Sequence, residues 1–427
     1  MDLYGELDWR GLVHTATDGL PEVLRHQKVT AYVGFDPTAS SLHVGHLLPL
    51  LALARLQRCG HSPIAVVGGG TGLIGDPSLR STERVLLTIE QAETNVAGIR
   101  SQLSRFLDFE HTMNPARLVN NAEWLMKLGA IEFMRDVGKH FTVNAMIAKE
   151  SVRRRIEGGD GISYTEFSYP LLQSYDFLVL HDRFGCTLQV GGSDQWGNIT
   201  AGMDLIRRVR GVKAHGLVLP LLMTASGTKF GKTEAGSVWL DSHLTKPYQF
   251  YQFWLHTDDR DAVKYLKFFT YLPQERIAEL DAATAREPER RHAQRELAQQ
   301  VTRLVHGEEA VREAEAAAQT LFGGDISGMS VSQLLQAFPN VPSSTTAFAP
   351  DGWPIVELLA SSGVTPSKSE ATRLIRSGGI YVNSRRVTDE KRRLRPEDAV
   401  EGQLFVVRKG KHDNFLIRIV RGLSSHK

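Results

Sequence analysis

The chain has 427 residues, of which 42% are hydrophobic and 23% charged, and its formal net charge is +2, which indicates a globular protein of two or three domains. Its first residues carry no signal-peptide pattern and no apolar run approaches ~20 residues, so we expect neither export nor a membrane span. Only Cys59 and Cys186 are present, too few for a disulfide framework or a cysteine-rich metal site, and we expect a cytoplasmic protein.

The first clear unit of the chain is a strand, a helix and a second strand. Apolar residues alternate from Val29 to Phe35, and Pro37 then ends the strand because it has no N–H to donate. An apolar helix is expected at 47–56, and the next strand at 62–67. This pattern predicts an α/β fold with a parallel sheet and a right-handed crossover.

A His-x-Gly-His motif, His43 to His46, falls at the start of the crossover helix. Roughly 0.05 such matches are expected by chance in a chain of this composition. Free N–H groups and the helix dipole favour anions such as phosphates there, and Gly45 would let a flat ligand such as adenine approach closely. The alternative is a pair of surface or packing histidines. A metal site is less favoured, because the spacing is not that of a helical zinc pair.

A glycine-rich loop, 68–78, follows the second strand and is typical of a nucleotide site or of an ordinary tight loop. Asp76 in this loop could pair with a substrate ammonium, or form an Asx-turn with Ser78. Arg80 and Arg84 lie just downstream, where a solvated helix face is the alternative to phosphate binding.

Helices are expected at 88–108 and 131–157, with a short strand at 116–119 between them. The second helix ends in a basic cluster that includes Arg153 and Arg154. Such clusters are most often solvated, but with Arg207 and Arg208 on a later helix this one could bind a polyanion.

Tyr169, Gln173 and Asp176 share one face of a helix whose other residues are mostly apolar, with Pro170 near its first turn. Because buried polar groups need partners, this face either bonds to other protein groups or lines a polar pocket, and we favour the pocket.

Strands at 187–190 and 217–223 are each followed by a polar segment. The first segment, Gly191 to Asn198, is Gly-Gly-Ser-Asp-Gln-Trp-Gly-Asn and suits close contact with a ribose. The second, Thr224 to Thr233, contains two lysines and a hydroxyl and suits a mobile phosphate-binding loop, although it lacks the P-loop spacing. An exposed basic loop is the alternative.

The last third of the chain changes character. Residues 246–322 read as helical, and 339–350 are rich in Pro, Ser and Thr, as in a linker. From 353 to 427 there are 15 Lys and Arg against 8 Asp and Glu, a net charge of +7, so the rest of the chain carries −5. A basic tail on an acidic body indicates a module for a polyanion, with RNA the leading candidate.

Taken together, several motifs resemble the bacterial tyrosyl-tRNA synthetases, which are class I aminoacyl-tRNA synthetases. They are Tyr-x-Gly-Phe-Asp-Pro-Thr and His-Val-Gly-His, the Tyr169, Gln173 and Asp176 face, Gly-Gly-Ser-Asp-Gln-Trp-Gly-Asn, and Lys-Phe-Gly-Lys-Thr. The last departs from the class I pattern Lys-Met-Ser-Lys-Ser but keeps both lysines and the final hydroxyl. The tail resembles an S4 RNA-binding domain.

The resemblance implies four segments: a Rossmann-type catalytic domain at 1–235 with an inserted dimerisation segment at about 110–165, an α-helical anticodon-recognition domain at 236–330, a linker at 331–352, and a small α+β S4-like domain at 353–427. It also implies a homodimer that activates L-tyrosine with ATP, accompanied by Mg²⁺, and transfers it to tRNA(Tyr). No protein-bound metal, membrane or DNA partner is expected.

The same resemblance assigns roles to individual residues. The catalytic group would be Thr38, His43, His46, Arg80, Arg84, Lys229, Lys232 and Thr233. Tyrosine would contact Tyr32, Asp76, Tyr169, Gln173, Asp176 and Gln195. ATP would contact Gly34, Asp36, Gly45, Gly192, Asp194 and Lys232. The tRNA would contact Arg153, Arg154, Arg207, Arg208, Lys368, Arg373, Arg376, Arg385 and Arg386.

Two other functions compete with this one. The chain could be a nucleotidylyltransferase that adenylylates a small acid without tRNA, but the basic tail counts against that. It could also be an inactive synthetase-like protein that binds RNA or assists splicing, which the intact histidine and lysine pairs argue against.

Overall fold

The computed structural model describes residues 2–78, 86–158, 161–228, 230–233, 236–321, 326, 328–338, 341–410 and 413–420. Arg80, Arg84 and Lys229 therefore lie outside the described residues. The chain divides into two compact units, one of 1–245 with 253–301 and one of 246–252 with 302–427. None of the described helices combines the length and apolar character that a membrane span needs.

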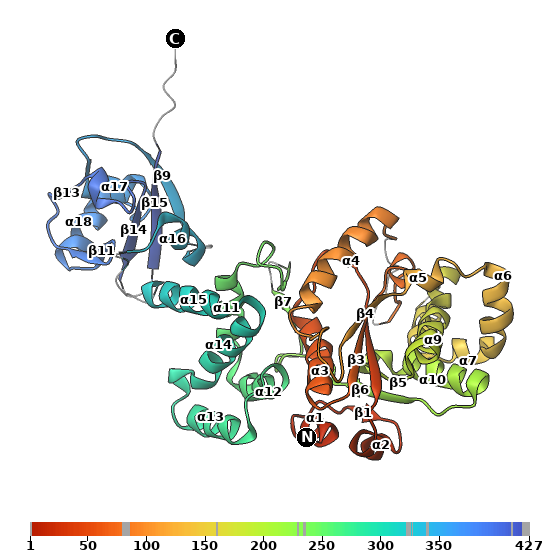
Figure 1. Ribbon diagram of the computed structural model, residues 1–427. Coiled ribbons are helices and arrows are strands. Elements are labelled where there is room, and N and C mark those ends of the chain that lie inside the picture. The colour runs from red at the N-terminus through yellow and green to blue at the C-terminus, as the bar shows by residue number, and fades with distance from the viewer. Residues whose placement is uncertain are drawn as a thin grey trace, which may run out of the picture. The chain divides into compact units, whose positions relative to one another are not determined.

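The first unit is built on a mainly parallel sheet with the strand order β1-β6-β5-β2-β3-β4 (Figure 1). Only β1 runs antiparallel, against β6. The strands are β1 (Thr15–Ala16), β2 (Thr30–Phe35), β3 (Ser62–Val67), β4 (Arg117–Asn120), β5 (Cys186–Gly192) and β6 (His215–Leu219). This arrangement confirms the predicted Rossmann-like α/β fold.

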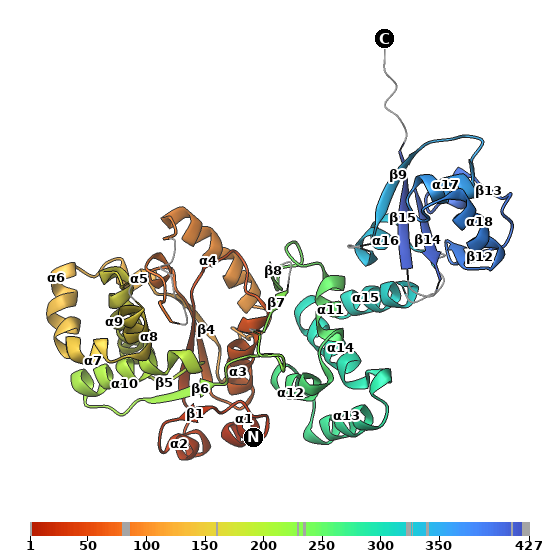
Figure 2. The same ribbon diagram turned by 180° about the vertical axis from the view of Figure 1, so that it is seen from behind.

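Helices cover both faces of this sheet, with α3 on one side and α9 and α10 on the other (Figures 1 and 2). Leu50, Leu51 and Leu53 of α3 are fully buried, as its uninterrupted apolar sequence requires. On the opposite face, a core cluster joins Tyr32 and Ile64 of the sheet to α9 and α10. The helices up to this point are α1 (Leu3–Trp9), α2 (Leu20–His26), α3 (Leu47–Arg58), α4 (Ile89–Leu103), α5 (Ala122–Leu125), α6 (Ala130–Glu132), α7 (Val143–Ile147), α8 (Glu150–Glu157), α9 (Tyr164–Phe184) and α10 (Trp196–Arg210).

Two expectations about these helices were wrong. The segment 131–157 is not one helix: α6 passes into a π-helical turn at Phe133–Val137 and a 3₁₀ turn at Gly138–His140 before α7 and α8. Pro170 does not lie in the first turn of its helix, because Ser163 caps α9 and the helix begins at Tyr164. Gly185, with φ +62°, ends α9 in the left-handed conformation.

The rest of the chain is helical up to residue 321 and then forms a second sheet. The helices are α11 (Pro247–Leu255), α12 (Asp259–Phe269), α13 (Gln274–Arg286), α14 (His292–His306), α15 (Glu308–Leu321), α16 (Val331–Ala337), α17 (Ile355–Ser361) and α18 (Lys368–Arg376). The second unit's sheet has the order β12-β11-β14-β15-β9. Its strands are β9 (Ser343–Ala347), β11 (Ile380–Val382), β12 (Arg385–Val387), β14 (Leu404–Lys409) and β15 (Asp413–Val420), beside a small pair, β10 (Trp353–Pro354) and β13 (Arg393–Leu394).

The expected linker at 331–352 is instead part of this fold. β9 pairs in parallel with β15, from Ser343 opposite Leu416 to Ala347 opposite Val420. Leu334 of α16 is fully buried in a cluster with Leu404 and Leu416. The Ser- and Thr-rich composition concealed an edge strand, because hydroxyl side chains are tolerated where a strand faces solvent.

Buried arginines tie the N-terminal part of the first unit to the end of α12. Arg10 donates to the carbonyl oxygens of Lys267, Thr270 and Leu272 at 2.9, 3.1 and 2.8 Å. Arg55 of α3 donates to the carbonyls of Phe268 and Thr270 at 2.9 and 2.8 Å, and burial lowers the pKa of Arg55 to about 10. The last carbonyls of a helix have no partner inside it, so these guanidinium groups act as its cap.

We predict that Arg10→Ala lowers the free energy of unfolding by about 3 kcal/mol, because buried carbonyls lose their donors and Glu6 loses its ion pair. Urea unfolding followed by circular dichroism measures the change. Arg25→Ala is the matched control, since the side chain of Arg25 is 46% exposed and its ion pairs lie on the surface. Equal losses in the two variants would contradict the capping role.

Candidate active site

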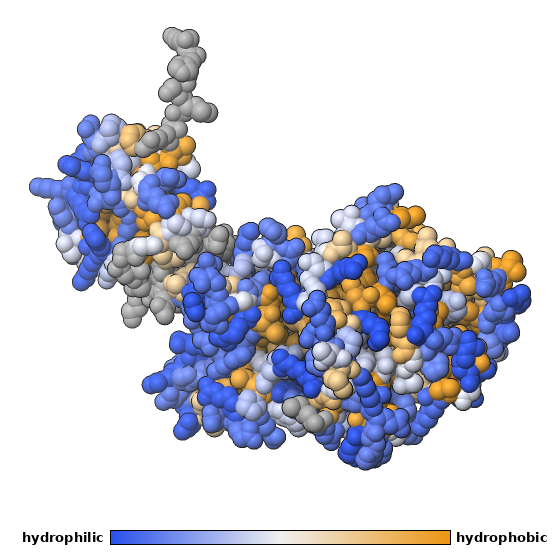
Figure 3. Space-filling model, in the orientation of Figure 1, coloured by the Kyte–Doolittle hydropathy of each residue, from blue (hydrophilic) through white to orange (hydrophobic). Residues whose placement is uncertain are grey.

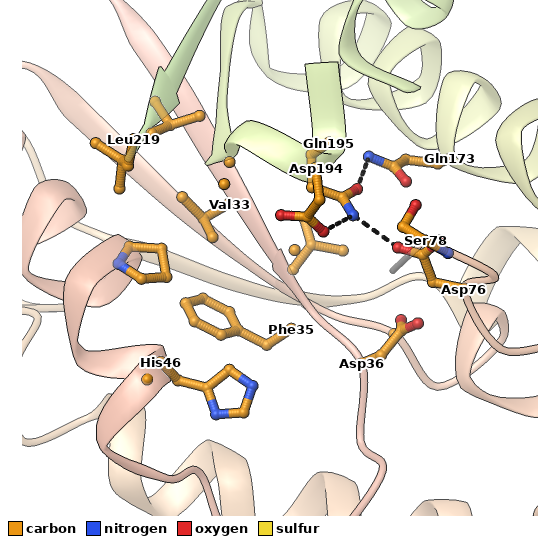
Figure 4. Close-up of a pocket in the computed structure, with 18 of the residues that line it drawn as sticks. Val33, Phe35, Asp36, His46, Asp76, Ser78, Gln173, Asp194, Gln195 and Leu219 are labelled. Atoms are coloured by element: carbon orange, nitrogen blue, oxygen red, sulfur yellow. Dashed lines mark hydrogen bonds between the residues drawn. The ribbon is translucent and has the colours of Figure 1, made fainter. Parts of the chain in front are cut away.

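A cavity in the first unit lies at the carboxyl ends of β2, β3 and β5 and has a volume of about 720 Å³ (Figure 4). Open parallel sheets bind ligands at this edge, where the strand order reverses between neighbouring crossovers. The residues that line it come from β2, from the histidine motif and the start of α3, from the loop after β3, from α9, from β5 and the segment after it, and from the segment after β6. The cavity is therefore assembled from parts of the chain as far apart in sequence as Tyr32 and Phe230.

One end of the cavity holds a buried carboxylate and a buried phenol. Asp176 accepts hydrogen bonds from Trp124 Nε1 at 2.7 Å and from Asn121 Nδ2 at 2.9 Å, and burial raises its pKa to about 7. Tyr32 Oη is buried and has no hydrogen-bond partner among the described residues. Burial and the Asp176 charge raise the pKa of Tyr32 well above its ordinary value, so the phenol stays neutral. This end can therefore bond to a ligand hydroxyl.

The middle of the cavity is a network of amides and carboxylates (Figure 4). Gln195 Nε2 donates to Asp76 Oδ2 at 2.7 Å and to Asp194 Oδ2 at 2.9 Å, and Gln173 Nε2 donates to Gln195 Oε1 at 3.2 Å. The Asx-turn considered for Asp76 is present, since Ser78 N donates to Asp76 Oδ1 at 2.8 Å. The turn and the network use different oxygens of Asp76, so the turn orients the carboxylate toward the cavity.

Another carboxylate, that of Asp36, connects the end of β2 to two neighbouring elements, α9 and the loop after β3. It accepts from Tyr169 Oη of α9 and from Thr71 Oγ1 of the loop after β3, each at 2.7 Å. Asn121 in turn donates to Thr71 Oγ1 at 2.9 Å. The Asp36 carboxylate also lies where a Cβ at Gly68 would be, so only glycine fits there.

The predicted histidine motif begins a 3₁₀ turn, Val44–His46, that leads into α3. His43 Nδ1 accepts from Gly45 N at 3.0 Å, and His46 Nδ1 accepts from His43 N at 3.1 Å. The two rings stack with centroids 3.9 Å apart. Because both Nδ1 atoms accept, each neutral ring carries its proton on Nε2, which makes the two imidazoles hydrogen-bond donors.

Gly231 of the predicted phosphate loop, and the segment 238–240 that follows the loop, run beside this motif. Val44 N donates to Val238 O at 2.9 Å, and Leu240 N donates to Leu42 O at 2.8 Å. Gly231, with φ +83°, lies so close that a Cβ there would meet Val44 Cγ2 at 2.9 Å. Lys232 and Thr233 form β7, paired with β8 (Gly236–Ser237), and the structure describes these two residues by their backbone alone.

Comparison with known proteins identifies the fold. The family model "tRNA synthetases class I (W and Y)" matches residues 24–323, and the model of the tyrosine–tRNA ligase SYY-like C-terminal domain matches 333–417. The tyrosine–tRNA ligase of Roseiflexus castenholzii is 55% identical over 418 residues, which cover 97% of this chain and 99% of that protein. The chain belongs to the tyrosyl-tRNA synthetase family.

Two further relatives extend the similarity. The tyrosine–tRNA ligase of Geobacillus stearothermophilus is 53% identical over 423 residues, which cover 98% of this chain and all of that protein. Among solved structures, a C-terminally truncated mitochondrial tyrosyl-tRNA synthetase from Aspergillus nidulans superimposes with a TM-score of 0.68 at 31% identity, covering 75% of this chain and 94% of that one.

In this synthetase the cavity brings together most of the residues singled out from the sequence. They are Tyr32, Gly34, Asp36, Thr38, His43, Gly45, His46, Asp76, Tyr169, Gln173, Asp176, Gly192, Asp194 and Gln195. Arg80, Arg84 and Lys229 lie outside the described residues. Thus the cavity contains every predicted tyrosine-binding residue and, among those whose side chains the structure describes, every predicted ATP-binding residue.

Sequence reasoning missed one polar residue that lines the synthetase cavity, Asn121, and two that interact with carboxylates lining it, Trp124 and Lys149. Asn121 and Trp124 follow β4 at the same edge of the sheet, and the only available signal was their place after a short strand. Lys149 was missed too: its Nζ is buried without a hydrogen-bond partner in the described part of the chain. Burial lowers the pKa of Lys149 to about 8, and the nearby charge of Asp76 opposes this shift.

The cations expected to bind tRNA, Arg154 among them, are exposed, and most of them form surface ion pairs. Arg207 and Arg208 both contact Asp204 at 2.5 Å. In the second unit, Arg373 pairs with Glu370, and Arg376 with Glu390. Two further ion pairs join Arg153 to Glu157 and Lys368 to Glu357. Arg386 donates to the carbonyl oxygens of Ser377 and Gly378, and Arg385 is exposed in β12. Such pairs stabilise little, so a phosphate can replace the acidic partner.

The buried Asp176 predicts a specific pH dependence of stability. The folded state binds the proton of Asp176 more tightly than the unfolded state, because its folded pKa of about 7 exceeds the ordinary value of 3.8. We therefore compare the free energy of unfolding of the wild type with that of Asp176→Asn. As the pH rises from 4 to 7, this difference should shift against the wild type by up to about 1.4 kcal/mol per pH unit, and above pH 7 it should stay constant. Urea unfolding at several pH values measures this difference.

Asp182, on the same helix, provides the control. A hydrogen bond from Arg210 holds the pKa of Asp182 below its ordinary value. The ionised Asp182 therefore stabilises the fold fully at any pH above that ordinary value, and this stabilisation is lost only as the pH falls below it. Asp182→Asn should thus show no slope between pH 4 and 7. A slope shared by both variants would show that another group titrates.

Proposed function

We propose that this protein is a tyrosine–tRNA ligase that activates L-tyrosine with ATP and then transfers the tyrosyl group to the 3′ end of tRNA(Tyr). The observation that carries the proposal is that one end of the cavity holds both a buried phenol, Tyr32, which has no hydrogen-bond partner among the described residues, and a buried carboxylate, Asp176. Relatives of nearly the same length are tyrosine–tRNA ligases.

The substrate phenol would donate to Asp176 and bond to Tyr32. Its ammonium would lie against Asp76, Tyr169 and Gln173, the polar groups in the middle of the cavity. Phenylalanine would leave the phenol of Tyr32 and the carboxylate of Asp176 buried without the bonds that a hydroxyl supplies. Buried polar groups without partners are costly, so the site selects tyrosine over phenylalanine.

In the activation step, a carboxylate oxygen of tyrosine attacks the α-phosphorus of ATP, and the bond to pyrophosphate breaks. The reaction needs no protein nucleophile, so the protein acts by positioning the reactants and stabilising charge. The Nε2–H groups of His43 and His46 are suited to donate to phosphate and ribose oxygens. The proposed ligands of the β- and γ-phosphates are Thr38, His43, Arg80, Arg84, Lys229, Lys232 and Thr233.

Other groups would hold the rest of the nucleotide. His46, Gly192 and Asp194 are proposed to bind the ribose, and Gln195 to lie near the carboxylate and the α-phosphate. Mg²⁺ would arrive with ATP and be held by its phosphates. Mg²⁺ would supply further neutralisation of the phosphate charge.

We also propose a cytoplasmic homodimer. Large apolar side chains lie exposed along the segment from α5 to α7: Met126, Ile131, Met134, Val143 and Ile147. Helices α6 and α7 lie at the right of Figure 1, and Figure 3 shows patches of apolar surface at that edge. Ile131 is 74% exposed, and several exposed apolar side chains on one segment indicate a protein interface. Both cysteines are free thiols, as expected in a reducing compartment.

Exchange of labelled pyrophosphate into ATP, without tRNA, tests the proposed activity. We expect exchange with tyrosine and much less with phenylalanine or tryptophan. Asp176→Ala should lower kcat/KM for tyrosine relative to phenylalanine by at least about tenfold, because a hydrogen bond to a charged group is lost. Tyr32→Phe keeps the ring and should lower the same ratio. Absence of exchange with all three amino acids would overturn the proposed activity in favour of an RNA-binding protein.

Size-exclusion chromatography with light scattering tests the dimer. Ile131→Asp should reduce the measured mass from twice 47.4 kDa to 47.4 kDa, because a charge would be buried at the interface. Leu244→Asp is the control, since Leu244 is 51% exposed but lies outside this segment. A wild-type chain that elutes as a monomer at micromolar concentration would contradict the proposal.

A further inference from the structure

The helix α12 fixes the start of the loop that runs from Thr224 to Thr233, here termed the phosphate loop. The carboxylate of Asp261 accepts a hydrogen bond from Ala225 N at 2.7 Å. Asp261 is only 4% exposed, so its charge has little access to water. Lys264, one turn further along α12, donates to Met223 O at 3.2 Å and lies 3.8 Å from Asp261. One helix therefore holds the backbone on both sides of Thr224.

The first turn of the phosphate loop is closed by its own hydroxyl groups. Thr224 Oγ1 lies 2.8 Å from Ser226 Oγ and 2.7 Å from Thr228 Oγ1, and Thr228 N donates to Thr224 Oγ1. Gly227, with φ +80°, allows the chain to reverse there. These contacts make 224–228 a compact unit whose orientation is set by the bond from Ala225 to Asp261.

Further along, Phe230 anchors the loop to the same helix by packing. Its ring is 5% exposed and lies 4.8 Å from the ring of Tyr265 and 5.4 Å from that of Phe269, both in α12. The next residue, Gly231, lies against Val44 of the histidine motif. The loop therefore runs from a polar contact on α12, through an aromatic contact on α12, to the motif proposed to bind phosphates.

We propose that Asp261 is a positioning residue of the activation step. Its buried carboxylate holds Ala225 N–H, and through it the position in which Gly231 lies against Val44 of the histidine motif. A buried carboxylate is costly unless its hydrogen bonds are made, so this one strongly favours a single position of Ala225. The inference rests on the proposed function, because the role of the loop is to present its lysine-bearing end to the nucleotide phosphates.

Pyrophosphate exchange separates this role from a purely structural one. Asp261→Ala should lower kcat at saturating tyrosine about tenfold and raise KM for ATP, while KM for tyrosine stays within about twofold of the wild type. Asp261→Asn keeps an oxygen that can accept from Ala225 N, so it should recover most of the lost rate. Hydrogen exchange of the Ala225 amide should be accelerated in Asp261→Ala and near the wild-type rate in Asp261→Asn.

Asp258→Ala is the matched control. Asp258 caps the start of α12 by accepting from Arg260 N, so this variant weakens the helix without removing a contact to the loop. It should lower stability without selectively raising KM for ATP.

The positioning role is overturned if Asp261→Ala keeps the wild-type kcat while its Ala225 amide exchanges faster, or if Asp261→Ala and Asp258→Ala show the same kinetic change. A wild type without exchange activity would overturn the proposed function, and the positioning role with it.

Discussion

The structure of the active site depends on how one buried carboxylate is satisfied. Asp176 lies on a helix, and its two donors, Asn121 and Trp124, come from the segment after β4, the edge strand of the sheet. A carboxylate in this position is tolerable only because both donors reach it. The same two bonds fix α9 against the edge of the sheet, so the polar site and the packing of the fold are stabilised by the same contacts.

The chain of hydrogen bonds continues across the site. Asn121 also donates to Thr71, Thr71 to Asp36, and Tyr169 returns to Asp36 from α9. These side chains thereby link the end of β2 to the loop after β3, and that loop to the segment after β4. A network of this kind orients its members before any ligand arrives, which lowers the cost of binding a polar substrate.

Much of this arrangement could be predicted from the sequence, for identifiable physical reasons. Alternating and continuous apolar runs predicted the parallel strands and the buried α3, and polar residues spaced along α9 in an otherwise apolar helix predicted a pocket. Asn121 and Trp124 could not be assigned, because their role depends on β4 lying beside β3, which no local pattern indicates. The break-up of 131–157 was missed as well, since helix propensity alone does not account for the turns around Gly138.

The strand β9 also affects how the second unit can form. Ser343 pairs with Leu416, more than 70 residues later in the chain, and β15 is the last strand of the sheet. The chain must therefore have left the ribosome as far as β15 before β9 can pair with the strand that neighbours it in the described sheet. Contacts between distant residues form slowly, so we expect the pairing of β9 to be a late step in the folding of the second unit.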